Sequence, residues 1–96
     1  MPRTVRNAPE RNRYELVEGE EVLGFADYHD RGDALVFPHT VIDPSQRGRG
    51  LGAILVRGAL DDVRAQGRKV VPSCWFVAEF IGLHNDYQDL LAEPKG

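Results

Sequence analysis

The chain has little cysteine, no long apolar run and no excess of positive charge. Its single cysteine, Cys74, cannot form an intrachain disulfide, whereas a secreted domain of this size would normally need several. No window holds the roughly 18 apolar residues of a membrane span. The formal net charge of −3 provides no field that would hold a nucleic acid or an anionic membrane. These absences predict a cytoplasmic protein, without a targeting segment, that binds neither nucleic acid nor membranes.

The length and composition indicate one small folded domain. A chain of 96 residues has room for one core, and 42% hydrophobic with 28% charged residues are typical of a globular protein. Residues 1–12 are polar, contain Pro2 and Pro9 and show neither helix nor strand periodicity, so we expect a loosely held tail there. We therefore predict a single domain over residues 13–92 and a second tail over residues 93–96.

The first half of this domain has the pattern of an antiparallel meander. Extended, apolar-rich segments at residues 14–18, 22–28 and 34–42 are separated by short turn clusters. Pro38 lies inside the third segment, and a proline cannot donate to the hydrogen-bond ladder of a sheet. We therefore expect strand pairing to fail beside His39.

The second half predicts a helix, a fourth strand and further helix. Apolar residues recur at helical spacing over residues 52–66, and Gly67 stops the helix. A short strand over residues 69–72 should run parallel to the third strand, because strand–helix–strand connections of this length are parallel and right-handed. Helical segments are expected at residues 76–83 and 86–91. The fold class is therefore α/β (α+β), with the order β-β-β-α-β-α.

A glycine-rich loop precedes the long helix, with the sequence Gln46-Arg47-Gly48-Arg49-Gly50-Leu51-Gly52. Its glycines let several N–H groups face one point, where the helix dipole favours an anion. Such a loop suits a phosphate or pyrophosphate, although a tight strand-to-helix turn has the same pattern. A nucleotide triphosphate loop would end in Gly-Lys-Ser/Thr, and no lysine follows here. A dinucleotide fingerprint would need an acidic residue where Ser73-Cys74-Trp75 stands.

This region resembles the GNAT acyltransferase superfamily, and most closely its small single-domain members. The matching segments are, in chain order, Phe37-Pro38-His39-Thr40, Asp43-Pro44, Arg47-Gly48-Arg49-Gly50-Leu51-Gly52, Val70-Val71-Pro72-Ser73-Cys74, Phe76-Val77-Ala78 and His84 to Tyr87. The resemblance implies a truncated GNAT-like fold and direct transfer of an acetyl group from acetyl-CoA to a primary amine in a ternary complex. It also implies a backbone site for the pantetheine arm at Val41 and Ile42. The implied pyrophosphate site comprises Arg47, Gly48, Arg49, Gly50, Leu51, Gly52 and Ala53.

Three positions depart from the family pattern. Family members commonly have a glutamate at the position of Val41, a tyrosine at Phe80 and a proline at Trp75. The first two differences remove a carboxylate and a phenolic hydroxyl, so catalytic roles do not transfer to these positions. A CoA-binding or protein-interaction module with weak catalysis is therefore an alternative. A protein-binding adaptor whose glycine loop is only a turn is a third reading.

His39 and Cys74 are the candidate catalytic residues. An ammonium must lose a proton before it attacks, and a histidine beside the expected opening of the sheet could take it; a structural histidine is the alternative. Cys74 ends the fourth strand near the implied thioester. It could accept the acetyl group as a thiolate, protonate CoA as a thiol, or be a small core residue. The hydroxyl of Tyr87 could replace the one missing at Phe80 in the cofactor site, or cap the edge of the core.

The acceptor and the oligomeric state stay open at this stage, and no metal site is assigned. Asp27, Asp30 and Asp33 could attract a cationic acceptor, such as a small amine, a polyamine, or a protein lysine or N-terminus. Solvated turn residues have the same composition. Because the chain is too short for the segments that enclose an acceptor in larger relatives, we expect an open acceptor site.

Overall fold

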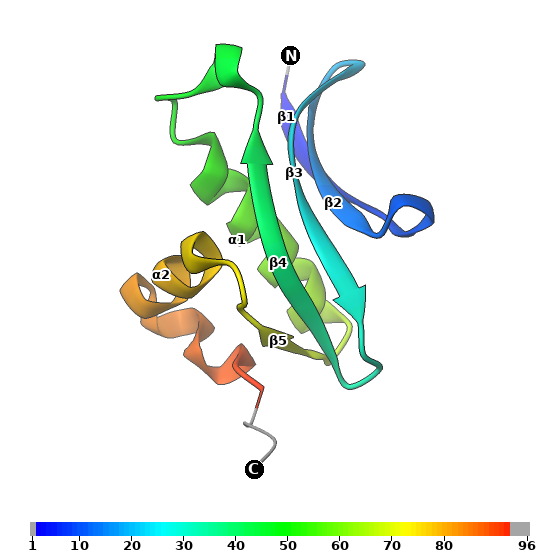
Figure 1. Cartoon of the computed structure of the whole chain (residues 1–96), viewed down its shortest axis with the longest axis vertical. Coiled ribbons are helices and arrows are strands. Elements are labelled where there is room, and N and C mark those ends of the chain that lie inside the picture. Colours follow the sequence, from blue (N-terminus) through cyan, green and yellow to red (C-terminus); the bar gives the residue numbers. More distant parts are fainter. Residues whose placement is uncertain (1, 93–96) are drawn as a thin grey trace.

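Five strands form one curled sheet in which neighbours in sequence are neighbours in space (Figure 1). The structure, a computed structural model, describes residues 2–92. The first four strands are antiparallel, and the fifth runs parallel to the fourth. Their bounds are β1 (Arg3–Ala8), β2 (Arg13–Glu18), β3 (Glu21–Asp30), β4 (Ala34–Ile42) and β5 (Lys69–Val71). The predicted meander and the predicted parallel strand are confirmed.

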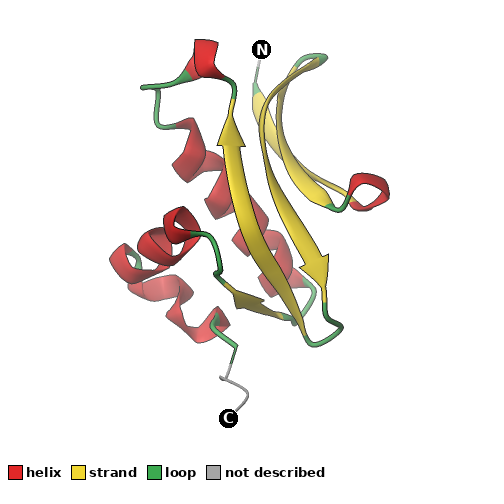
Figure 2. Ribbon diagram, in the orientation of Figure 1, coloured by secondary structure: helices red, strands yellow, loops and turns green. Residues whose placement is uncertain are grey.

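The long helix α1 (Leu51–Ala65) lies across one face of the sheet and contacts all five strands. α2 (Trp75–Leu83) and the 3-10 helix η3 (Asn85–Leu90) follow β5 and pack against α1 (Figure 2). Single 3-10 turns η1 (Pro9–Arg11) and η2 (Pro44–Gln46) complete the described chain. Among residues 2–92, none of the helices is long and apolar enough to cross a membrane.

The prediction of a loose tail over residues 1–12 is wrong for its described part, because residues 3–8 form β1 and pair with β2. Val5 of β1 packs against α1 at Gly58. A Cβ atom added at Gly58 would lie 2.5 Å from Cγ2 of Val5, so the absence of a side chain lets α1 approach β1 this closely. The second predicted tail, residues 93–96, lies outside the described residues.

A buried carboxylate ties β1, η1 and β2 together. Glu15 is fully buried, and Arg6, Arg11 and Arg13 all donate hydrogen bonds to it over 2.8–3.1 Å. The hydrogen bond from Arg11, followed by those from Arg13 and Arg6, outweighs burial and lowers the pKa of Glu15 to about 2. These contacts lie on the sheet face opposite α1, because Tyr14, the next residue of β2, donates to Asp62 of α1.

Strand β4 has β5 beside it along only part of its length. Residues 34–36 pair with residues 69–71, and one further contact follows, from the Cys74 N–H to the Phe37 carbonyl at 2.7 Å. Beyond this point the chain turns into α2. Within the described chain, residues 38–42 therefore have a strand on one side only, and their other edge is open.

Candidate functional site

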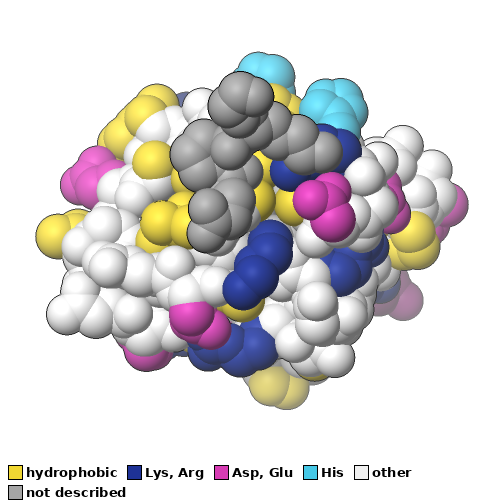
Figure 3. Space-filling view, turned by 90° about the horizontal axis from the view of Figure 1, so that it is seen from below, with side chains coloured by type: hydrophobic (Ala, Val, Ile, Leu, Met, Phe, Trp, Pro, Cys, Tyr) yellow, Lys and Arg dark blue, Asp and Glu magenta, His cyan; other side chains and the backbone are white. Residues whose placement is uncertain are grey.

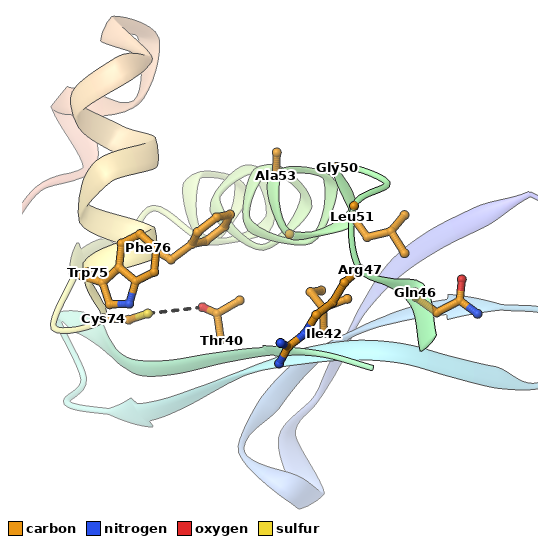
Figure 4. Close-up of a pocket in the computed structure, with 12 residues that line it drawn as sticks. Thr40, Ile42, Gln46, Arg47, Gly50, Leu51, Ala53, Cys74, Trp75 and Phe76 are labelled. Atoms are coloured by element: carbon orange, nitrogen blue, oxygen red, sulfur yellow. Dashed lines mark hydrogen bonds between the residues drawn. The ribbon is translucent and has the colours of Figure 1, made fainter. Parts of the chain in front are cut away.

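A cleft of about 400 Å³ lies between the open edge of β4, the start of α1 and the start of α2 (Figure 4). Cys74 and Thr40 stand at one end of the cleft, and Gln46, Arg47 and Gly50 stand at the other. Its lining comprises Thr40, Ile42, Gln46, Arg47, Gly48, Gly50, Leu51, Gly52, Ala53, Cys74, Trp75 and Phe76. The cleft is thus elongated, with chemically different ends.

The loop end of the cleft presents backbone N–H groups to an anion. Gly48 and Gly50 have φ angles of 83° and 70°, a left-handed conformation that glycine adopts without a steric penalty. Gly50 caps α1 without a side-chain hydrogen bond, and the first N–H of the helical ladder is that of Ile54, bonded to the Gly50 carbonyl at 3.4 Å. The N–H groups of residues 51–53 therefore remain for a ligand at the positive end of the helix dipole.

Gly52 has a different role from the two left-handed glycines. A Cβ atom added there would lie 2.8 Å from Cζ of Phe76. A glycine at this position therefore lets the Phe76 ring of α2 pack onto the first turn of α1. The sequence pattern predicts ligand approach at all three glycines of the loop. The structure shows that Gly52 instead makes room for the packing of α2 on α1.

The two arginines of the loop differ in their contacts. Arg47 lines the cleft and is exposed, so its guanidinium can add charge to the anion site. Arg49 lies outside the lining, and its guanidinium donates to the Gln46 side-chain oxygen at 2.8 Å. Arg49 therefore holds Gln46, which lines the cleft and which sequence reasoning did not select.

The other end of the cleft holds the thiol of Cys74. Cys74 is 8% exposed, occupies the N-cap of α2, and its Sγ lies 3.6 Å from Oγ1 of Thr40. Burial alone would raise the pKa of Cys74, but hydrogen bonds with the Val77 N–H, the Thr40 side chain and the backbone of Phe76 and Thr40 together outweigh it and lower that pKa. A larger thiolate fraction near neutral pH follows. The signal available in the sequence was the place of Cys74 directly before a helix.

The structure places two predicted site residues on the opposite face of the sheet. Side chains alternate along β4, so Thr40 and Ile42 face the cleft while His39 and Val41 face away and line separate concavities. His39 still pairs with Asp27 of β3. The predicted loss of pairing near His39 occurs between β4 and β5, whose pairing ends at Val36. Between β3 and β4 the pairing continues, with a register shift opposite Pro38. His39 and Cys74 therefore do not share one lining, although the open edge lies between them.

Tyr87 does not reach the cleft. Its buried hydroxyl donates to Asp61 at 2.6 Å and accepts from Arg57 at 3.2 Å, both on α1. Burial and the Asp61 carboxylate raise its pKa, which fixes the phenol as a neutral donor in the α1–η3 contact. Three further residues that line the cleft were not selected from the sequence: Thr40 of β4, and Trp75 and Phe76 of α2. They meet because α2 packs against β4 and α1.

Many exposed charges in the described chain form ion pairs. Figure 3 views the molecule from below relative to Figure 1, and on this face basic and acidic side chains lie next to one another. Arg68 is paired with Asp30, and Arg31 with Asp33. Two of the three aspartates considered for a cationic acceptor are therefore already occupied. Within residues 2–92, no three histidine, cysteine or acidic side chains gather into a metal site.

Comparisons with known proteins show the family and the fold of this chain. The model of a family described as GCN5-related N-acetyl-transferase matches residues 13–90. A search of curated proteins finds no match. The NMR solution structure of a GCN5-like protein from Staphylococcus aureus is 19% identical to this chain and superposes with a TM-score of 0.69. The superposition covers 95% of this chain and 89% of that one. At this identity the likeness concerns the fold.

Proposed function

The chain belongs to the family of GCN5-related N-acetyltransferases, and from this premise we propose that it transfers an acetyl group from acetyl-CoA to a primary amine. Family membership and fold support N-acetyl transfer in general. The observation that carries the specific proposal is the cleft, in which the free N–H groups at the start of α1 and a thiol of lowered pKa lie at opposite ends of an open strand edge.

The residues of the cleft fit acetyl-CoA. The N–H groups of residues 51–53 and the guanidinium of Arg47 would hold the pyrophosphate. The open edge of residues 38–42 offers backbone groups to the amides of the pantetheine arm, as it would to an added strand. A Cβ atom at Gly50 would meet no atom within 4 Å, so the cradle is open where a phosphate would approach.

In the proposed reaction, the side chains of this protein move protons. Acetyl-CoA supplies the acetyl group as a thioester, and the C–N bond forms as the C–S bond breaks. The acceptor ammonium first gives one proton to an imidazole nitrogen of His39, which passes it to solvent. The thiol of Cys74 protonates the departing sulfur and regains a proton released by the acylated nitrogen. Acetylated amine, CoA and one proton result.

A two-step route through Cys74 is the second candidate, favoured by the N-cap position of this thiol. In that route the Cys74 sulfur takes the acetyl group as CoA leaves, and the amine then takes it from Cys74. Intact mass after incubation with acetyl-CoA alone separates the routes. Direct transfer predicts no adduct, whereas a single-acetyl adduct on Cys74 that added amine discharges would establish the two-step route.

The function is tested by an acetyl-CoA titration together with CoA release against a panel of primary amines. We expect binding and turnover, and we expect His39→Ala to slow turnover by about 10²–10⁴-fold without weakening acetyl-CoA binding. Acetyl-CoA binding without turnover would instead indicate a CoA-binding module. Absence of both binding and turnover would indicate a protein-binding adaptor. The cytoplasmic location expected from the single cysteine stays a prediction.

A further inference from the structure

Asp27 is a carboxylate without a partner on the sheet face opposite the cleft. It is half-buried, and within residues 2–92 its side chain makes no ion pair or hydrogen bond, unlike Asp30 and Asp33. His39 is its direct cross-strand neighbour on β4, so the two side chains share one face with Cβ atoms about 5 Å apart. Together they line a concavity of about 340 Å³ that also contains His29 and Pro38.

The nearby arginines do not neutralise Asp27. Arg11, which also lines this concavity, pairs with Glu15 and Glu10. Arg13, its cross-strand neighbour on β2, pairs with Glu15. A partly desolvated carboxylate gains most from a cation that brings its own hydrogen-bond donors. A ligand ammonium meets this requirement.

An apolar concavity adjoins the first. It holds about 220 Å³. Most of its lining is apolar, including Val22, Phe25 and Val41, and its two charged members are Arg13 and Asp43. Phe25 and Val41 lie two residues from Asp27 and His39 on the same strands, a separation of about 7 Å. The guanidinium of Arg13 lies 4.3 Å above the Phe25 ring. This second concavity therefore accepts an apolar group, and its one carboxylate, Asp43, already accepts hydrogen bonds from the N–H and the hydroxyl of Ser45.

Resting on the proposed function, we propose that this face binds the acceptor, and that the acceptor is a primary monoamine with an apolar substituent. Its ammonium pairs with Asp27 beside His39, and its apolar part covers Phe25 and Val41. His39 stands on β4, whose other edge is open from Pro38 onward, and in this proposal the amine crosses that edge to reach a thioester held near Cys74. A polyamine fits less well, because the carboxylate that its second ammonium would approach, Asp43, is already hydrogen-bonded by Ser45.

The test uses amide-resolved NMR titrations of the full chain with 2-phenylethylamine and with spermidine. For 2-phenylethylamine, we expect shifts around Asp27, His39 and Val41, and an affinity that falls about tenfold in Asp27→Asn. Glu21→Gln is the matched control, because Glu21 is exposed on the same strand and outside both concavities. Spermidine should bind more weakly, and Val41→Glu should reverse this preference.

Three results would overturn the proposal: shifts confined to α1 and α2, equal affinities in wild type and Asp27→Asn, or spermidine bound as tightly as 2-phenylethylamine. Failure of the proposed function has a different signature. In that case the amine binds at Asp27 while acetyl-CoA binding or turnover is absent. Normal turnover whose KM for the amine does not change in Asp27→Asn would refute the acceptor site alone.

Discussion

Gly50 allows the cost of backbone strain to be separated from the loss of cofactor binding. Its φ angle is 70°, and a Cβ atom there would meet nothing within 4 Å. Gly50→Ala therefore introduces no clash, and its cost to folding is that of a left-handed alanine, about 1 kcal/mol. In a domain of this size, such a loss lowers the melting temperature by about 4–8 °C.

Gly67 provides a matched control at the other end of α1. Its φ angle is 69°, and a Cβ atom there would likewise meet nothing within 4 Å. It lies just beyond the C-terminus of the helix, outside the lining of the cleft. Gly67→Ala should therefore lose the same stability as Gly50→Ala and leave the anion site intact.

Acetyl-CoA affinity distinguishes the two variants. Trp75 is the only tryptophan of the chain and lines the cleft, so its fluorescence can report binding. We expect Gly50→Ala to raise the Kd at least about tenfold, equivalent to about 1.4 kcal/mol, and Gly67→Ala to leave it unchanged. Wild-type affinity in a folded Gly50→Ala protein would refute the phosphate site. Equal weakening in both variants would show that strain, and not contact with the phosphate, determines binding.

Three further predictions concern acid stability, helix packing and Tyr87. Because the pKa of Glu15 is about 2, below its ordinary 4.5, its carboxylate stabilises the fold above that ordinary value and loses this effect as the pH falls. Urea unfolding should show a loss of at most about 3 kcal/mol over this range; an equal loss in Glu15→Gln would contradict the assignment. Gly58→Ala should destabilise the fold by about 1–3 kcal/mol in thermal unfolding, and the double variant with Val5→Ala should recover part of this lost stability. No recovery in the double variant would show that the contact between Val5 and Gly58 does not hold β1 in place. Tyr87→Phe should lower the melting temperature and leave acetyl-CoA affinity unchanged; weaker binding would place its hydroxyl in the site after all.

Structural features that depend on the local residue pattern could be predicted from the sequence. Apolar periodicity placed α1, the glycines marked the loop at its start, and Pro38 marked the place where β4 loses regular pairing. Each of these features is determined by residues within one turn or strand. The family resemblance rested on the same segments, and the family match confirms it.

Features that depend on contacts distant in sequence could not be predicted. β1 has only Val5 and Ala8 directed away from solvent, and what orders it is pairing with β2, the Glu15 ion pairs and the space at Gly58. The lowered pKa of the Cys74 thiol depends on the nearby Val77 N–H and also on Thr40, which lies on β4, a strand distant in sequence. Side-chain alternation along β4 could have separated His39 from Ile42, since the two differ by an odd number of positions.

An amide-resolved NMR titration of the full chain with acetyl-CoA measures directly whether the cleft binds the cofactor. The N–H groups of residues 51–53 should shift most at the loop end, those of residues 40–42 along the open edge, and that of Cys74 at the thiol end. The control Gly67→Ala should retain this pattern, and Gly50→Ala should lose it at the same acetyl-CoA concentration. Shifts that spare residues 51–53, or saturable binding that maps to β1 and β2, would contradict the account.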